Sequence, residues 1–254
     1  MIPSFGCSNR NLIPEQMDDP ALAVKHHRQA LGDLARLNFL SDATHSIWQF
    51  MEAWIREKSS DKLGFPLRVL DLATGAGDIP RRLMREARSR SLSLKVDGCD
   101  RSFQAVAYAR DQARKENIGT HFFQCDVLKD PIPNGYDGFI NSLFLHHLSE
   151  TDTLHFIQRL KKQAPRFMIL QDLIRSRRGL ALAYAASRLF TRSKVVHFDA
   201  PQSVRRAYTP EEIGALCQRA GLEESPKGKA IGEQEGWTIR RVWPFRFAVI
   251  WKRV

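Results

Sequence analysis

Short apolar runs alternate with helix-like stretches through the central part of the chain. The runs have the hydrophobicity of buried strands, and most of the stretches between them space their apolar residues three or four apart, as a helix with one buried face does. Strands are expected at 68–72, 92–99, 121–125, 136–143 and 166–171, and helices at 80–90, 103–115 and 149–163. Strands that alternate with helices predict an α/β fold with a parallel sheet.

The flanking regions follow other patterns. Residues 1–20 are polar and proline-containing, so we expect a loose arm, whereas 21–58 predict two helices with a break at 38–41. Beyond the fifth strand we expect a short apolar helix at 176–193, a polar and aromatic loop up to Tyr208, and a helix that begins with the capping box of Thr209 and Glu212. The runs 236–243 and 245–252, separated by Pro244, predict a hairpin at the edge of the sheet.

Composition narrows the class of protein. The chain has 254 residues, of which 43% are hydrophobic, so it can bury the core of one α/β domain. No apolar run reaches the roughly 18–20 residues that span a bilayer, and the N-terminus lacks the pattern of a secretory signal. Four scattered cysteines predict reduced thiols rather than a disulfide framework. These features predict a soluble, cytoplasmic protein.

Charge is unevenly distributed. The formal net charge is +11, and the segment 161–206 holds eleven Lys or Arg against two Asp. A basic amphipathic helix at 176–193 can lie at a membrane surface, dock on an acidic carrier protein, or form a lid with solvated charges. The sequence leaves these alternatives open.

The stretch Arg68–Pro80 carries the clearest chemistry. A strand ending in Asp71 is followed by a turn with Gly75 and Gly77, and then by a helix start, which brings backbone N–H groups close to a nucleotide-like ligand. A dinucleotide site wants a third glycine where this chain has Pro80. Because Asp71 and Asp78 flank the loop, it favours a ligand with cationic groups over a diphosphate.

These residues resemble the first motif of the class I S-adenosylmethionine-dependent methyltransferases, which reads like Leu70, Asp71, Gly75 and Gly77 here. The resemblance covers about residues 66–172. It implies a Rossmann-like, seven-stranded mixed sheet, mostly parallel with the last strand antiparallel, with helices on both faces. It further implies an arm and helical lid at 1–60 and a methyltransferase domain at 61–254, with a substrate-covering insertion at about 176–208. The implied cofactor is S-adenosyl-L-methionine, with S-adenosyl-L-homocysteine as product.

Candidate cofactor-binding residues follow each strand. Asp100 lies twenty-three residues past Gly77, near the spacing at which a carboxylate accepts hydrogen bonds from ribose hydroxyls. The resemblance implies that Asp126 and Val127 contact the adenine. The carboxyl end of the fourth strand should line the same crevice. The full candidate set is Asp71, Ala73, Thr74, Gly75, Gly77, Asp78, Asp100, Arg101, Ser102, Asp126, Val127, Asn141, Ser142 and Leu143.

Candidates for proton transfer are His146, His147, His197 and Tyr208. Adjacent histidines point in different directions and seldom chelate one metal, so we expect no metal site. A capping or core role for His146 and His147 is an equal alternative to a catalytic one.

The residues at the end of the fourth strand disfavour some classes of methyl acceptor. Asn141-Ser142-Leu143-Phe144 does not match the Pro-Pro-aromatic pattern of nucleic-acid amino-methyltransferases, so a nucleic-acid partner is disfavoured. The chain looks most like the ubiquinone and menaquinone biosynthesis methyltransferases and related small-molecule enzymes. The expected acceptor is an aromatic or lipid-like hydroxyl or ring carbon, such as a phenol, quinol or polyketide. The alternatives are an RNA or protein methyltransferase, a cofactor-binding protein without catalysis, and a dinucleotide oxidoreductase. The sequence does not fix the oligomeric state.

Overall fold

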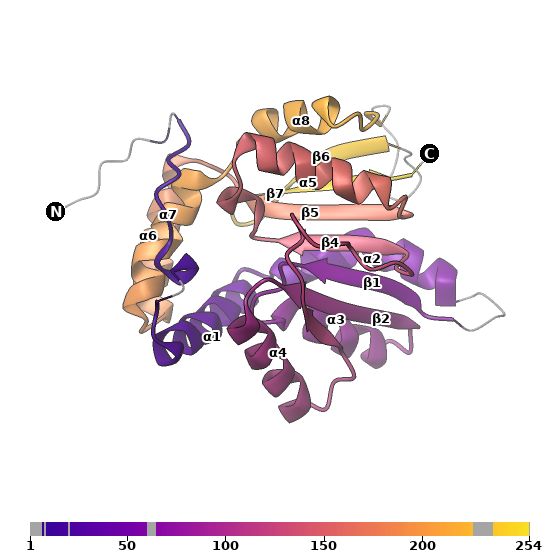
Figure 1. The fold of residues 1–254 in the computed structure, drawn as a ribbon, viewed down its shortest axis with the longest axis horizontal. Coiled ribbons are helices and arrows are strands. Elements are labelled where there is room, and N and C mark those ends of the chain that lie inside the picture. Colours follow the sequence, from indigo (N-terminus) through magenta and orange to yellow (C-terminus); the bar gives the residue numbers. More distant parts are fainter. Residues whose placement is uncertain (1–6, 8, 20, 60–64, 226–235, 254) are drawn as a thin grey trace.

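The protein is described here from a computed structural model that covers residues 7, 9–19, 21–59, 65–225 and 236–253. These residues form a seven-stranded sheet in the order β3-β2-β1-β4-β5-β7-β6 (Figure 1). Its strands are β1 (Leu67–Leu72), β2 (Leu94–Asp100), β3 (Phe122–Gln124), β4 (Gly138–Ser142), β5 (Phe167–Leu173), β6 (Gly236–Val242) and β7 (Arg246–Lys252). The first five pair in parallel, while β7 is antiparallel to both β5 and β6. The expected Rossmann-like mixed sheet is confirmed.

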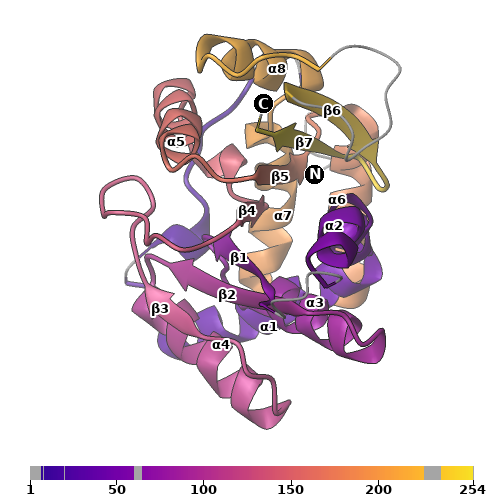
Figure 2. The same ribbon diagram turned by 90° about the vertical axis from the view of Figure 1, so that its right-hand side faces the viewer.

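Helices cover both faces of this sheet. On one face α2 (Ala43–Ser59) and α3 (Asp78–Ser89) enclose a core around Trp48, Met51 and Leu83. On the other face α5 (Glu150–Lys162) and α8 (Pro210–Arg219) enclose a second core around Phe156 and Leu216. Figure 2 shows α2 and α3 on the opposite side of the sheet from α5. Helix α4 (Phe103–Lys115) packs against β2 and β3. The near-continuous apolar strands are therefore buried on both sides, as in other parallel sheets.

Three helices stand beyond one end of the sheet. They are α1 (Val24–Leu40), α6 (Arg177–Phe190) and α7 (Lys194–Arg206), which pack on one another at the left of Figure 1. Loops that follow β1, β2 and β4 face the same region, because parallel strands place their carboxyl ends at one edge. The space between these loops and the three helices is where a ligand can be enclosed.

Two expectations for the flanking regions were wrong. The segment after α6 is not a loop but the helix α7, which Ser193 caps by accepting a hydrogen bond from the backbone N–H of Val196. Pro201 lies inside this helix. Part of the expected loose arm is packed, since Glu15 is only 6% exposed and a short 3-10 helix covers Gln16–Asp18. The proposed boundary between residues 60 and 61 lies outside the described residues.

Candidate functional site

The loop after β1 adopts a conformation that its two glycines permit. Gly75 and Gly77 have φ angles of +54° and +65°, in the left-handed region that residues with a Cβ rarely adopt. A Cβ on Gly77 would lie 2.6 Å from the ring of Phe122, whereas a Cβ on Gly75 would meet nothing within 4 Å. The backbone N–H of Gly75 donates to Asp100 at 2.9 Å. Gly77 thus serves the packing of the loop, and Gly75 faces open space.

A cavity of about 660 Å³ lies beside this loop. The Asp100 carboxylate fixes its wall, because its two oxygens accept the N–H groups of Gly75 and Ser102 at 2.9 and 2.8 Å. Of the candidate cofactor-binding residues, the cavity is lined by Ala73, Thr74, Gly75, Asp78, Asp100, Arg101, Ser102, Ser142 and Leu143. Segments far apart in the sequence complete the wall with Glu15, Asp18, Leu31, Leu34, Asn38 and His147.

Two candidates from the strand ends are turned inward instead. Asp71 is buried, and its carboxylate accepts a hydrogen bond from the Thr74 hydroxyl at 2.5 Å. Asn141 is fully buried and donates to the carbonyl of Leu72 at 2.6 Å. Together with Gly77, these residues hold the shape of the loop without lining the cavity.

Acidic groups crowd the cavity wall. Burial raises the pKa of Asp71 to about 8, and the neighbouring carboxyls Asp78 and Asp100 add to the shift. Burial likewise raises the pKa of Asp78 and of Asp100. A cation held next to the loop would favour the ionised forms of these carboxyls. The wall is therefore suited to a ligand that carries positive charge.

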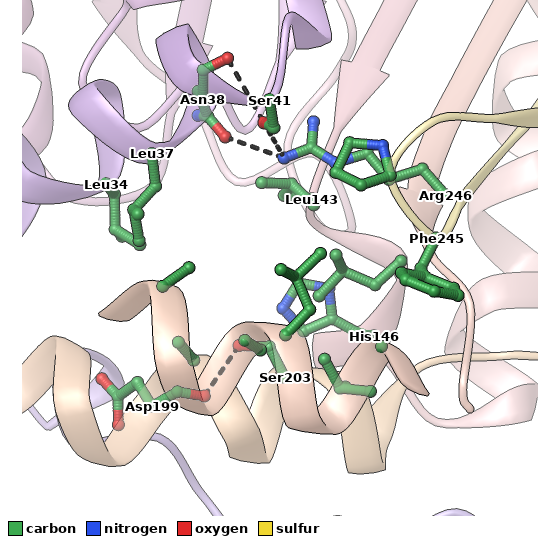
Figure 3. A pocket seen from close by; sticks show the side chains of 18 of the residues that line it. Leu34, Leu37, Asn38, Ser41, Leu143, His146, Asp199, Ser203, Phe245 and Arg246 are labelled. Atoms are coloured by element: carbon green, nitrogen blue, oxygen red, sulfur yellow. Dashed lines mark hydrogen bonds between the residues drawn. The ribbon is translucent and has the colours of Figure 1, made fainter. Parts of the chain in front are cut away.

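A second cavity of about 180 Å³ adjoins the first, and its lining is mostly apolar (Figure 3). It is lined by Leu34 and Leu37 of α1 and by Ala183 and Ala186 of α6, and Phe245 lies at one end. Both cavities share the lining residues Glu15, Leu34, Asn38, Leu143 and His147. The two spaces thus meet at a junction where a polar cavity gives way to an apolar one.

Two histidines and two carboxylates meet at this junction. His146 is 3% exposed, and its Nδ1 lies 2.7 Å from Asp172 while its Nε2 lies 3.5 Å from Glu15. The Nε2 of His147 lies 3.8 Å from the other oxygen of Glu15. The expectation that the adjacent rings point in different directions was wrong, because both residues lie in a 3-10 turn at Leu145–His147 with ring centroids 4.3 Å apart. The three side chains of Glu15, His146 and His147 offer ligand atoms within 4.8 Å of one another.

The carboxylates determine the protonation of His146. Burial alone would lower its pKa, but the ion pairs with Asp172 and Glu15 outweigh burial and raise the pKa of His146 to about 10. The same pairs hold the pKa of Asp172 and of Glu15 below the usual range, against the effect of burial. A protonated His146 cannot accept a proton, so it is no general base in this state.

Comparisons with known proteins agree with this geometry. Residues 69–163 match the family model described as a methyltransferase domain. A demethylmenaquinone methyltransferase of Thermus thermophilus is 36% identical over 70 residues, which is 28% of this chain and 30% of the relative. A ubiquinone/menaquinone biosynthesis C-methyltransferase of Burkholderia vietnamiensis is 26% identical over 136 residues, or 53% of either chain. This chain thus spans about a third and about half of the length of these relatives.

A solved structure shares the fold. The S-adenosylmethionine-dependent methyltransferase of Aquifex aeolicus aligns with 78% of this chain and 89% of its own, at a TM-score of 0.51 and 22% identity. Residues 69–163 thus form a methyltransferase domain, and the described fold is that of an S-adenosylmethionine-dependent methyltransferase. The cofactor of such a domain is S-adenosyl-L-methionine.

The two residues expected to contact the adenine do not line the cavity beside the glycine loop. Asp126 accepts the backbone N–H of Leu128 in a turn, and Val127 is 4% exposed in the core. Two of the candidates for proton transfer also line neither cavity. The Nε2 of His197, on α7, lies 3.2 Å from the carbonyl of Thr191, and the Tyr208 hydroxyl pairs with Thr153 at 2.8 Å.

The sequence did not predict that the N-terminal segment contributes a residue to the junction of the cavities. Arg10 stacks its guanidinium 3.6 Å from the ring centre of Tyr208 and donates to the carbonyls of Leu148 and Arg206. These contacts bring Glu15 to the junction of the cavities. The only signal in the sequence was the acidic run Glu15-Gln16-Met17-Asp18-Asp19, which has no helical or strand period.

The basic segment 161–206 is partly structural. Arg206 is 5% exposed and donates to the carbonyls of His146 and His147, and Arg175 pairs with Glu212 at 2.6 Å. On α6, however, Leu189 and Phe190 are 76% and 48% exposed. Among the described residues, none of the helices combines the length and apolar character needed to cross a bilayer.

Proposed function

We propose that this protein transfers the methyl group of S-adenosyl-L-methionine to a small, apolar acceptor of the aromatic or lipid-like type, at a hydroxyl oxygen or ring carbon. One observation carries the proposal, namely the apolar cavity that opens into the acidic cavity beside the glycine loop. A small molecule in the apolar cavity would present one edge to a cofactor in the other. The quinone-biosynthesis relatives, by their names, support an acceptor of this kind.

The residues beside the glycine loop fit this cofactor. Two acceptor oxygens on Asp100 suit the ribose hydroxyls, since each oxygen keeps a second lone pair beyond its bond to the backbone. The open space at Gly75 admits the methionine moiety close to the main chain. Asp78, whose pKa burial raises, would gain an ionic partner in the cofactor's ammonium group. For Asp126 and Val127 the proposed contact with adenine rests on the family resemblance.

The bound cofactor supplies an electrophilic methyl group on a sulfonium. The chain's own part is to align the acceptor and exclude water, which can supply several kcal/mol. Leu143, Leu34 and Leu37 form the apolar walls that do so. A hydroxyl acceptor must also lose a proton, and Glu15 and His147 lie at the junction where that proton leaves.

Turnover with labelled cofactor tests the proposal. Purified protein is incubated with S-adenosylmethionine carrying a tritiated methyl group and a panel of phenols, quinols and naphthols. We expect label to appear in at least one organic product, with S-adenosylhomocysteine formed in equal amount. Stoichiometric binding of the cofactor with no transfer to any member, but transfer to RNA or protein, would contradict the acceptor class.

The rival RNA methyltransferase has its own measurement. If the basic segment bound RNA, affinity would fall steeply with salt, because each neutralised phosphate releases counterions. We expect only weak RNA affinity that is lost as salt rises, because Arg175 and Arg206 in this segment are buried in internal contacts and only its remaining basic side chains can reach phosphates.

A further inference from the structure

We infer that Glu15, His146 and His147 form a binding site for one divalent transition-metal ion, such as Zn²⁺, at the junction of the two cavities. The inference deepens the proposed function and rests on it for the role of the ion, but the site itself rests on geometry. It replaces the expectation from the sequence that no metal is bound.

The ligand atoms are close to the arrangement that an ion requires. The Nε2 atoms of His146 and His147 lie 3.5 and 3.8 Å from the two oxygens of Glu15. These distances exceed the usual hydrogen bond of about 2.7–3.2 Å. Donor atoms bound at about 2.0–2.2 Å to one zinc ion lie roughly 3.0–3.5 Å apart. The ligand atoms of all three side chains lie within 4.8 Å of one another, so small side-chain movements toward a common point would bring them onto one ion.

A second carboxylate orients each ring. Asp172 lies 2.7 Å from Nδ1 of His146, and Asp18 lies 3.0 Å from Nδ1 of His147. Asp172 also accepts the backbone N–H of His146 at 2.9 Å, which fixes it in place. Histidines that bind metals through one ring nitrogen usually donate the other N–H to a carboxylate in this way. The two ring planes are tilted by 36°, yet the Nε2 atom of each ring faces an oxygen of Glu15.

The donor set indicates the class of ion. Two imidazoles and one carboxylate suit Zn²⁺, Co²⁺, Fe²⁺ or Mn²⁺ better than Mg²⁺ or Ca²⁺, which prefer oxygen ligands throughout. Arg206 lies 3.9 Å from Glu15 and 3.7 Å from Asp18, so it offsets part of the acidic charge without hydrogen-bonding to Glu15. Charge from Glu15, Asp18 and Asp172 remains for a dication to balance.

Three protein ligands leave a coordination position open, as in catalytic rather than structural zinc sites. Because Glu15 and His147 line both cavities and His146 lines the apolar one, that position faces the place of the acceptor. An ion there would bind the oxygen of an acceptor hydroxyl and lower the pKa of that hydroxyl. The site thus favours an oxygen acceptor over a carbon one.

Titration of the chelator-treated full-length protein with Co²⁺ tests the site without any turnover. We expect one equivalent to bind, with the visible absorption of a four- or five-coordinate N/O site, and Zn²⁺ but not Mg²⁺ to displace it. Glu15→Gln and His147→Ala should each weaken Co²⁺ binding by about 100-fold. Asp18→Asn should weaken it by about tenfold, since it removes only the partner of Nδ1. His155→Ala, which changes an exposed histidine on α5, should bind Co²⁺ like the unchanged protein.

Binding of S-adenosylhomocysteine to the same samples separates this inference from the proposed function. If that ligand binds and Co²⁺ does not, the metal site is refuted, His146 remains an imidazolium between its carboxylates, and the proposed function stands. Stoichiometric Co²⁺ binding that survives both Glu15→Gln and His147→Ala places the ion elsewhere and also overturns the inference. Loss of Co²⁺ binding in these two variants, with S-adenosylhomocysteine binding and circular dichroism unchanged, supports it.

Discussion

The two cavities of this protein are built in different ways. The cavity beside the glycine loop takes more than half of its lining from the carboxyl ends of β1, β2 and β4 and from the turns and helix starts that follow them, and the rest from the N-terminal segment and α1. The apolar cavity takes its wall from α1, α6, α7 and the turn before β7, together with Glu15 from the N-terminal segment. The first is formed largely at one sheet edge, whereas the second needs segments up to some two hundred residues apart to pack together. Local backbone geometry dominates the first, and tertiary packing dominates the second.

The largest effect on ligand affinity is expected at Asp100, because one carboxylate holds the loop that lines the first cavity. Asp100→Ala removes the acceptor of the Gly75 and Ser102 N–H groups and the proposed ribose contact. We expect S-adenosylhomocysteine to bind about 100-fold more weakly by calorimetry, since hydrogen bonds to a charged group contribute about 1.5–3 kcal/mol each. The control Asp111→Ala removes a carboxylate from surface ion pairs on α4. An equal loss of affinity in both variants would mean that the carboxylate of Asp100 has no special role in the first cavity.

A somewhat smaller effect is expected in the second cavity. Ala186 on α6 lines it, so Ala186→Phe should fill much of its roughly 180 Å³ and raise the KM of the acceptor about thirtyfold. The dissociation constant of S-adenosylhomocysteine should stay within about twofold. Ala185→Phe places the same ring on the exposed neighbour in the helix and should leave both constants unchanged. Weaker cofactor binding in Ala186→Phe alone would show that the cavities are not separable.

The two cavities differ in how far their residues can be predicted from the sequence. Asp100 and Gly75 could be predicted because a strand, a turn and a helix start fix their position within a few residues. The inward turn of Asp71 could not, since only the tertiary structure shows that the Thr74 hydroxyl engages its carboxylate. Glu15 had no periodic signal, and it reaches the junction through contacts such as that of Arg10 with Tyr208. The helix α7 was missed because the polar and aromatic residues before Tyr208 indicated a loop, although Ser193 caps its first turn.

The protonation of Asp71 provides a third test, on stability. The folded protein holds the pKa of this buried carboxyl at about 8, above its value of about 4 in an unfolded chain. Between these values the folded state binds more protons than the unfolded state, so this group lowers stability as pH rises from about 4 to 8. Asp71→Asn removes this dependence. We expect its advantage in unfolding free energy to grow by about 1 kcal/mol per pH unit from pH 5 to 8 and then level off.

Denaturant unfolding at several pH values checks this outcome. Asp152→Asn serves as a control, because Asp152 is an exposed carboxylate at the start of α5. A constant difference between Asp71→Asn and the unchanged protein across this range would mean that the fold does not raise the pKa of Asp71 and that its carboxyl is ionised throughout.

The smallest effect is expected where the N-terminal segment is attached. Arg10→Ala loses the stacking on Tyr208 and the bonds to the Leu148 and Arg206 carbonyls, all partly buried. The expected loss of unfolding free energy is about 0.5–1 kcal/mol. Acceptor KM should rise with little change in S-adenosylhomocysteine affinity, since Arg10 supports the segment that carries Glu15. Arg10→Lys should recover less than half of the loss, because lysine lacks the planar fork. If Arg10→Lys recovered all of the lost unfolding free energy, the contribution of Arg10 would come from its charge alone.

The central claim is that an acidic cavity beside the glycine loop binds S-adenosylmethionine. Calorimetric titration of the purified protein with S-adenosylhomocysteine, and in parallel with NAD⁺, tests it most directly. We predict one equivalent of S-adenosylhomocysteine bound in the micromolar range or tighter, and no heat of binding from NAD⁺. Binding of NAD⁺ with no response to S-adenosylhomocysteine would contradict the account.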